Sequence, residues 1–262
     1  MFNLMNLIYI CVFYQESYIY LLKLLMSSIY KHSSNIQILI STSPTFQPII
    51  EKELSSIHLP IVYQILDLHT LTEASSSKLN IFQYKDIDLY TKILYLDTDV
   101  LINSDINVLF EQEISAHKLY ALEENVISDI NHGSQFFRTS NINKDVTAFS
   151  AGILYFHNSP AMKALFRDIN KHMAEYIEKT KISKIYKLVC HEQPFVIYNA
   201  IIQNKYDNQF LKTYVENNPL AVDPVKIIYH FPGHTGNYEN KYEKMTNFWK
   251  KMEESLTIIS FP

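Results

Sequence analysis

The segment of residues 92–102 constrains this chain most, because it is apolar almost throughout and yet contains two acids. Its aromatic and branched aliphatic residues predict a buried central strand. A carboxylate in a buried strand is very costly unless something pairs with it, so Asp97 and Asp99 need a partner. Alternation along an extended chain would point these two carboxylates to one side and Thr98 to the other.

Two carboxylates on one side of a strand's carboxyl end offer hard oxygen ligands for Mg2+ or Mn2+. Such sites commonly hold the ion through one or two carboxylates together with the phosphates of a substrate. The alternative interpretation is a solvated turn, in which Asp is common. The apolar residues on both sides of residues 97–99 favour the metal site.

Length, charge and glycine content limit the class of protein. With 262 residues, 47% of them apolar, and no repeat or linker, the chain is expected to form one domain over residues 1–262. The net charge is -4 and no long basic run occurs, so binding to nucleic acid is not expected. The chain has 4 glycines, and a Gly-rich dinucleotide-binding or P-loop fingerprint is absent.

Residues 1–13 are largely apolar but do not form a targeting or membrane signal. They carry no Lys or Arg and no small-residue cleavage pattern, and they are too short to span a bilayer, so no membrane anchor is expected. Cys11 and Cys190 give neither a disulfide framework nor a zinc-binding spacing, which favours a reducing compartment. A cytoplasmic location is the default expectation, and the sequence carries no signal for an oligomeric state.

The first part of the chain alternates between short apolar runs and segments with helical spacing. Strands are predicted at residues 7–13, 36–40 and 61–66, and helices at 15–31 and 49–57. This alternation indicates a parallel sheet. Further on, the same patterns predict a short helix at 78–82, strands at 119–122, 149–156 and 225–231, a long polar loop at 125–146, and helices at 160–178, 192–202 and 240–255.

Four motifs, in order along the chain, resemble those of glycogenin-like glycosyltransferases (family 8). Residues 95–101, with Leu-Phe at 109–110, are similar to the metal-binding segment of that family. Residues 149–153, Phe-Ser-Ala-Gly-Ile, are similar to its Phe-Asn-Ala/Ser-Gly-Val strand. Glu192-Gln193 is similar to its Asp-Gln helix start, and His230-Phe231-x-Gly233 to its late His-x-x-Gly turn. An Asp-x-Asp alone is a weak signature, whereas four ordered matches over nearly the whole chain are specific.

The resemblance implies a GT-A fold, which is an α/β fold with a Rossmann-like, mostly parallel central sheet flanked by helices. It also implies a retaining enzyme that moves a hexose from a UDP-sugar to an acceptor, here an unknown glycan or protein. A divalent ion stabilises the charge on the departing diphosphate in such enzymes. Asp97, Asp99 and His230 would hold the ion, and the imidazole favours Mn2+ over Mg2+. The alternative for His230 is a core histidine on an apolar strand.

The resemblance places four further residues near the donor sugar: Lys78, Ser150, Glu192 and Gln193. Gln193 would lie near the anomeric carbon, and Glu192 would bind sugar hydroxyls. The family usually has Asn where this chain has Ser150, and Asp where it has Glu192, which indicates a changed sugar pocket. The alternatives are a solvated helix lysine for Lys78 and an ordinary polar first turn for Glu192-Gln193.

The resemblance also assigns residues to the nucleotide. Tyr14, Gln15 and Tyr18 occupy the places around the uracil, with Tyr14 replacing the expected Thr, and Tyr18 could stack on the base. Gly233 would let the backbone approach the phosphates. The family usually has a Lys on the diphosphate at the position of Gly236, and the basic residues that could replace it are His234, Lys241 and Lys244.

Two other functions remain open from the sequence. The departures at residues 14, 150 and 236 are compatible with a non-catalytic nucleotide-sugar-binding protein of the same fold. A Mg-dependent phosphohydrolase or nucleotidyltransferase also uses paired carboxylates on a sheet, but no further acids or nucleophile are visible near the motif. The transferred sugar, the acceptor and any self-glycosylation are not indicated, since nothing singles out one of the 19 tyrosines.

Overall fold

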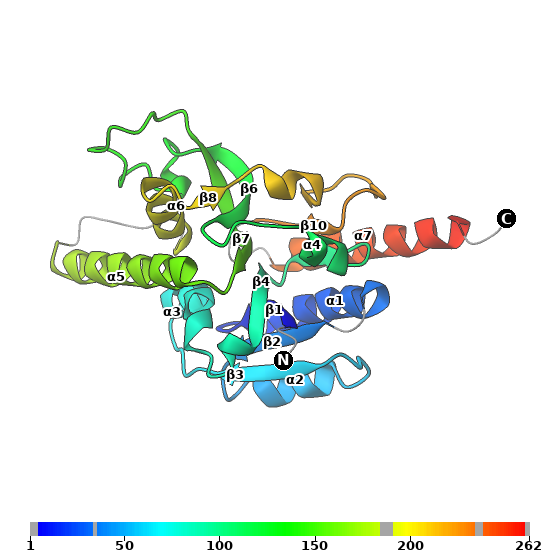
Figure 1. Ribbon diagram of the computed structural model, residues 1–262. Helices are drawn as coiled ribbons and strands as arrows, with labels where there is room; N and C mark the ends of the chain where they lie inside the picture. The colour runs from blue at the N-terminus through cyan, green and yellow to red at the C-terminus, as the bar shows by residue number, and fades with distance from the viewer. Residues whose placement is uncertain (1–4, 34–35, 184–190, 234–237, 260–262) are drawn as a thin grey trace. The chain divides into compact units, whose positions relative to one another are not determined.

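The computed structural model describes residues 5–33, 36–183, 191–233 and 238–259, which have an α/β architecture (Figure 1). Within these residues, seven strands form one sheet in the order β3-β2-β1-β4-β7-β6-β8, and three form a second sheet in the order β5-β10-β9. The predicted α/β class with a mostly parallel central sheet is confirmed. Two compact units can be distinguished in the described chain, and the expectation of a single domain stays a prediction.

Unit 2, made of Leu7–His69, Leu96–Glu113 and Thr213–Pro262, begins with the predicted alternation of strands and helices. Parallel strands need a crossover between them, and two helices supply it. Helix α1 buries the apolar side predicted for it, which includes Leu22, Leu25 and Ile29. The elements are β1 (Met5–Val12), α1 (Ser17–His32), β2 (Gln37–Thr42), α2 (Gln47–Glu53) and β3 (Ile61–Ile65), and the three strands are parallel.

The apolar segment that contains the two acids forms two strands and not the single strand predicted. Strand β4 (Tyr90–Leu96) ends at the first acid, the next three residues bend, and β5 (Val100–Ile102) belongs to the second sheet. There β5 is antiparallel to β10 (Ile228–His230), which is parallel to β9 (Val215–Asn217). The prediction of one continuous strand is wrong because Asp favours a turn over the interior of a buried ladder.

The second sheet packs against α1 and the closing helix α7 (Tyr238–Ile259). Their shared core consists of buried aromatic, leucine and methionine side chains, and Tyr18 packs partly buried against it. The short helix α4 (Asn107–Glu111) follows β5. The members of this core are Leu21, Leu101, Tyr229, Phe231, Met245, Phe248 and Met252.

Unit 1, made of Met1–Asn6, Thr70–Tyr95 and Ile114–Lys212, contains β4, β6, β7 and β8. Strand β6 is antiparallel to β7 and parallel to β8, and both predicted strands of this region are confirmed. A helix begins after Thr70, and the side chains of Thr70 and Glu73 form a capping box at its start. The elements are α3 (Leu71–Ser76), β6 (Leu119–Val126), β7 (Thr147–His157), α5 (Pro160–Ser183), α6 (Gln193–Ile202), β8 (Tyr206–Asp207) and the short 3-10 helices η1 (Ser77–Gln83), η2 (Ile87–Leu89), η3 (Ile130–His132) and η4 (Phe210–Thr213).

The polar segment after β6 is mainly loop, as predicted, and it packs against the start of α6. Gly133 has φ 89°, and a Cβ at this position would lie 3.1 Å from the carbonyl oxygen of Pro194. The ring of Phe136 lies 4.9 Å from that of Phe195. The loop is therefore anchored beside the helix that carries the Glu-Gln pair.

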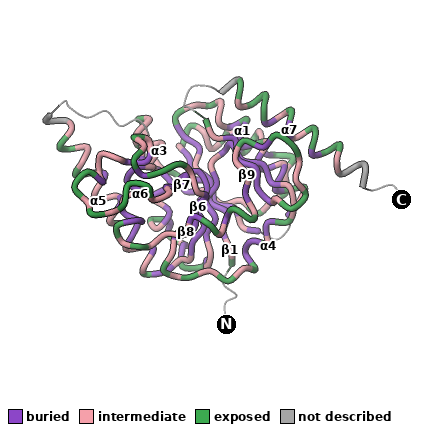
Figure 2. The backbone as a smooth tube through the Cα atoms, turned by 90° about the horizontal axis from the view of Figure 1, so that it is seen from above, coloured by how far each residue is buried: buried purple, intermediate pink, exposed green. Residues whose placement is uncertain are grey.

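The exposure of the residues differs between the strands and the long helices. Strands β1, β6 and β7 are mainly buried, whereas α5 and α7 carry many exposed positions on their outer sides (Figure 2). Among the described residues, none of the helices combines the length and the apolar character that crossing a membrane requires.

Candidate metal centre and donor-sugar cluster

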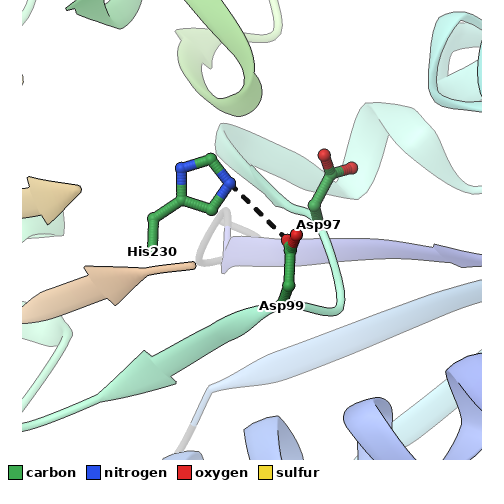
Figure 3. Close-up of side chains that lie close together, drawn as sticks. All are labelled: Asp97, Asp99 and His230. Atoms are coloured by element: carbon green, nitrogen blue, oxygen red, sulfur yellow. Dashed lines mark ion pairs between the residues drawn. The ribbon is translucent and has the colours of Figure 1, made fainter. Parts of the chain in front are cut away.

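Asp97, Asp99 and His230 come together in unit 2 (Figure 3). Each offers one ligand atom, and these atoms all lie within 4.8 Å of one another. The backbone explains this placement, because β10 pairs with β5 and the amide of Phe231 donates to the carbonyl oxygen of Asp99 at 2.9 Å. The pairing of β10 with β5 therefore places the imidazole of His230 beside the bend that carries the two acids.

The Asp99 carboxylate is buried and incompletely paired. Its Oδ1 is a buried oxygen without a hydrogen-bond partner, and it lies 3.5 Å from Nε2 of His230. Its Oδ2 accepts from the ammonium of Lys241, the fourth residue of α7. Burial opposes ionisation of Asp99, but His230 and the Lys241 charge outweigh burial and hold the pKa of this carboxyl well below its usual range.

Asn217 is a residue of this centre that the sequence did not reveal. It lies opposite His230 in the β9–β10 pair, and its Oδ1 is 2.8 Å from Nδ1 of His230. An amide oxygen can only accept, so Nδ1 carries a proton and donates it to Asn217, and Nε2 is the nitrogen that faces Asp99. A hydrogen bond of this kind commonly fixes the tautomer and the orientation of a metal-binding histidine.

These residues fit a divalent ion. The carboxylates of Asp97 and Asp99 and Nε2 of His230 are three groups of the kind that bind metal ions, and they lie close together. The orphaned Oδ1 of Asp99 lacks the proton or cation that a buried carboxylate oxygen requires. Oxygen and imidazole ligands together suit Mn2+ and related divalent ions.

The residues predicted for the nucleotide also lie in unit 2. Tyr14 is half-exposed and has φ 70°, Gln15 is partly buried, and Thr98 is buried in the bend between the two acids. Burial raises the pKa of Tyr18, and Asp99 and Asp97 raise it further against the opposing charge of Lys241. The structure therefore places Tyr18 within electrostatic range of the metal centre.

The turn after β10 bears on the predicted phosphate contact. Gly233 is exposed, and a Cβ there would lie 3.7 Å from Cε of Lys241, an ordinary contact distance. The packing of the described residues therefore does not require glycine at this position. His234 and Gly236 lie outside the described residues, and Lys244 is exposed on α7.

In unit 1, Lys78 and Glu192 form a buried ion pair with a distance of 2.8 Å between Nζ and Oε1. The same ammonium donates to the carbonyl oxygen of Ala151 at 3.0 Å and lies 4.7 Å from the ring centre of Tyr95. The alternative of a solvated lysine is therefore wrong, because Lys78 is only 5% exposed.

Gln193 is held by the backbone on two sides. Its Oε1 accepts from the amide of Ala151 at 3.0 Å, and its Nε2 donates to the carbonyl oxygen of Asn131 at 3.4 Å. Glu192 precedes α6 and makes no side-chain capping bond; its carboxylate pairs with Lys78. Ser150 is buried, and its Oγ accepts from the amide of Gly152 at 3.2 Å. The residues predicted for the donor sugar thus form one cluster within this unit.

Comparison with known proteins decides the family. Residues 9–236 match the model of glycosyl transferase family 8. The chain belongs to glycosyl transferase family 8. The matched stretch of this family 8 chain includes both clusters but ends before Lys241. The resemblance stated from the four motifs is confirmed.

Solved structures show that the family 8 chain has a GT-A-like fold. The galactosyltransferase LgtC, solved with donor and acceptor sugar analogs, has a TM-score of 0.59 at 17% identity, over 93% of this chain and 96% of LgtC. Mouse xyloside xylosyltransferase 1 has a TM-score of 0.58 at 11% identity, over 86% and 97% of the two chains. The bifunctional glycosyltransferase WbbM has a TM-score of 0.61 at 14% identity over 96% of this chain, which spans about half (51%) of WbbM. No curated protein matches the chain.

Proposed function

We propose that this family 8 glycosyltransferase is an active, metal-dependent retaining enzyme that transfers a hexose from a UDP-sugar to a glycan or protein acceptor. The observation that carries the proposal is the convergence of Asp97, Asp99 and Nε2 of His230, with the His230 tautomer set by Asn217. The intact set of Asp97, Asp99 and His230 favours an active enzyme over a non-catalytic binding protein of the same fold.

Asp97, Asp99 and His230 would hold Mn2+ or Mg2+. When bound, the ion would supply positive charge to the diphosphate as it departs from the sugar. Tyr14, Gln15 and Tyr18 would contact the uridine, since Tyr18 lies within electrostatic range of the centre. The absence of a side chain at Gly233 leaves its backbone accessible to phosphate oxygens.

The sugar would be contacted by the cluster of unit 1. In the reaction the bond from the anomeric carbon to the phosphate oxygen breaks, and its electron pair leaves with UDP. The acceptor hydroxyl then forms the new bond on the same face, and its proton goes to the departing phosphate oxygen. Gln193 would position the anomeric carbon because both ends of its amide are held by backbone groups. Glu192, oriented by Lys78, would bind sugar hydroxyls.

The donor sugar is a separate question. LgtC is a galactosyltransferase and the mouse enzyme a xylosyltransferase, so similar folds serve different sugars. We therefore assign the class of donor, a UDP-sugar, and leave its hexose to experiment.

Calorimetric titration of UDP into the protein, with and without Mn2+, tests the proposal. We expect binding that depends on the metal, followed by slow hydrolysis of one UDP-sugar among UDP-glucose, UDP-galactose and UDP-N-acetylglucosamine. Metal-dependent binding without hydrolysis or transfer from any of them would favour the non-catalytic binding protein. An absence of UDP binding under either condition would contradict both functions.

A further inference from the structure

The ammonium of Lys241 occupies one oxygen of the central metal ligand. It contacts Oδ2 of Asp99, and both side chains are largely buried, at 15% and 10% exposure. The two groups form an ion pair, so the charge of the lysine balances the charge of the carboxylate. The centre thus already contains one cation that belongs to the chain itself.

A divalent ion and this ammonium compete for the same carboxylate. Asp99 Oδ1 and Nε2 of His230 lie 3.5 Å apart, so an ion bound between them would come next to Lys241 (Figure 3 shows the space between the three ligands). Like charges at short range in a buried place repel strongly. The ion therefore binds at the expense of the contact between Lys241 and Asp99.

A lysine side chain is a flexible four-carbon stem, so the ammonium of Lys241 can turn away from Asp99. A diphosphate near the ion would offer several negative oxygens as a new partner for the ammonium.

We propose that Lys241 is the internal counter-cation of the metal centre, which leaves Asp99 for the diphosphate when metal and nucleotide bind together. This inference rests on the proposed function. It explains how a centre with two acids avoids unbalanced buried charge before substrate arrives. It predicts that the metal alone binds weakly and that UDP strengthens its binding, because only UDP offers the displaced ammonium a partner.

The test is a pair of calorimetric titrations on parent, Lys241→Met and Lys241→Gln proteins, with Lys250→Met, at an exposed lysine of α7, as the matched control. Mn2+ is titrated first without nucleotide, and UDP is then titrated at saturating Mn2+. Removal of the ammonium should tighten Mn2+ alone and weaken UDP, each by at least about tenfold. A residue with a merely structural role would not move the two affinities in opposite directions. The Lys250 variant should match the parent in both affinities.

Three results would overturn the inference. Mn2+ binding that is no tighter in either Lys241 variant would show that the ammonium does not compete with the ion. Loss of both affinities together would assign Lys241 a structural role, as would failure of both variants to fold. If the parent protein binds UDP with the same affinity in the presence and absence of metal, Lys241 permanently takes the place of the ion. The Mn2+ titration needs no nucleotide, so it tests the competition even if the chain binds no UDP and the proposed function fails.

Discussion

The backbone amide of Phe231 donates to the carbonyl oxygen of Asp99 at 2.9 Å, which ties β10 to the acid-bearing bend. This bond uses no carboxylate oxygen. The side chain of Asp99 can therefore be changed while the backbone that positions it stays in place.

Replacing Asp99 with Asn should remove metal-dependent UDP binding and leave the fold intact. Asn has the same shape and still accepts from Lys241, but it lacks the charge that a divalent ion requires. UDP titration with and without Mn2+ measures the effect, and a thermal melt checks the fold. Unchanged metal dependence in the variant would show that the site assignment is wrong.

Replacing Asn217 with Leu should weaken Mn2+ binding by about 10–100-fold, the usual cost of losing the partner that orients a metal-binding histidine. Without its acceptor, Nδ1 of His230 is free to lose its proton to Nε2, which would then no longer offer a lone pair. Asn217→Asp retains an acceptor and serves as the control. Equal Mn2+ affinity in the Leu variant and the parent would exclude this role.

Much of the fold could be predicted from the sequence, because β1, β2 and β3 are apolar runs separated by helical spacing. The break between β4 and β5 could not be predicted, since apolar residues continue on both sides of the acids and the pairing of β5 with β10 makes β5 a separate strand. Local sequence patterns do not indicate which distant segments pair as strands.

Some residues of the candidate site could likewise be predicted from the sequence, and others could not. Asp97, Asp99 and His230 are recognisable by type and motif, and the structure brings them together. Asn217 lies on a three-residue strand, which is too short to show any periodicity. The burial of Lys78 depends on Glu192, a partner far along the chain that spacing alone does not identify.

Replacing Tyr18 with Ala should weaken UDP binding in the presence of Mn2+ by about 1–3 kcal/mol, the range for stacking between a base and an aromatic ring. Tyr18 also packs against the apolar core of unit 2, so Ala should lower the melting temperature as well. Tyr18→Phe keeps the ring and serves as the control, which should retain both the UDP affinity and the melting temperature of the parent. If Ala and parent proteins bind UDP equally, Tyr18 does not stack on the base.

Replacing Gln193 with Ala should slow sugar transfer much more than it weakens UDP binding, because a contact near the anomeric carbon acts on the transition state. Glu192→Asp should change the ranking of UDP-glucose, UDP-galactose and UDP-N-acetylglucosamine, since the shorter acid cannot keep its 2.8 Å contact with Lys78 and also reach the same hydroxyls. Turnover of each donor measures both effects. Parent-like rates and ranking would place the pair outside the sugar pocket.

Stability should fall as the pH drops below about 6.5, the pKa of an unfolded histidine. Burial lowers the pKa of His172 in the folded chain, with Glu175 opposing and Lys179 adding to the shift. The unfolded state therefore binds more protons, and the stability present above that pH is progressively lost below it. His172→Gln should flatten the plot of unfolding free energy against pH, apart from the slope that His32 contributes through its own lowered pKa. An unchanged slope would contradict this origin.

Tyr14, the second residue after β1, has φ 70°, and the other described non-glycine residues with positive φ are Asn125, Asn204 and Asn218. Asparagine tolerates this conformation well, whereas a bulky residue stores about 1–3 kcal/mol of strain there. A substitution that relieves this strain would stabilise the protein but would also remove the aromatic ring of residue 14. Any function lost together with the strain would show what the ring does.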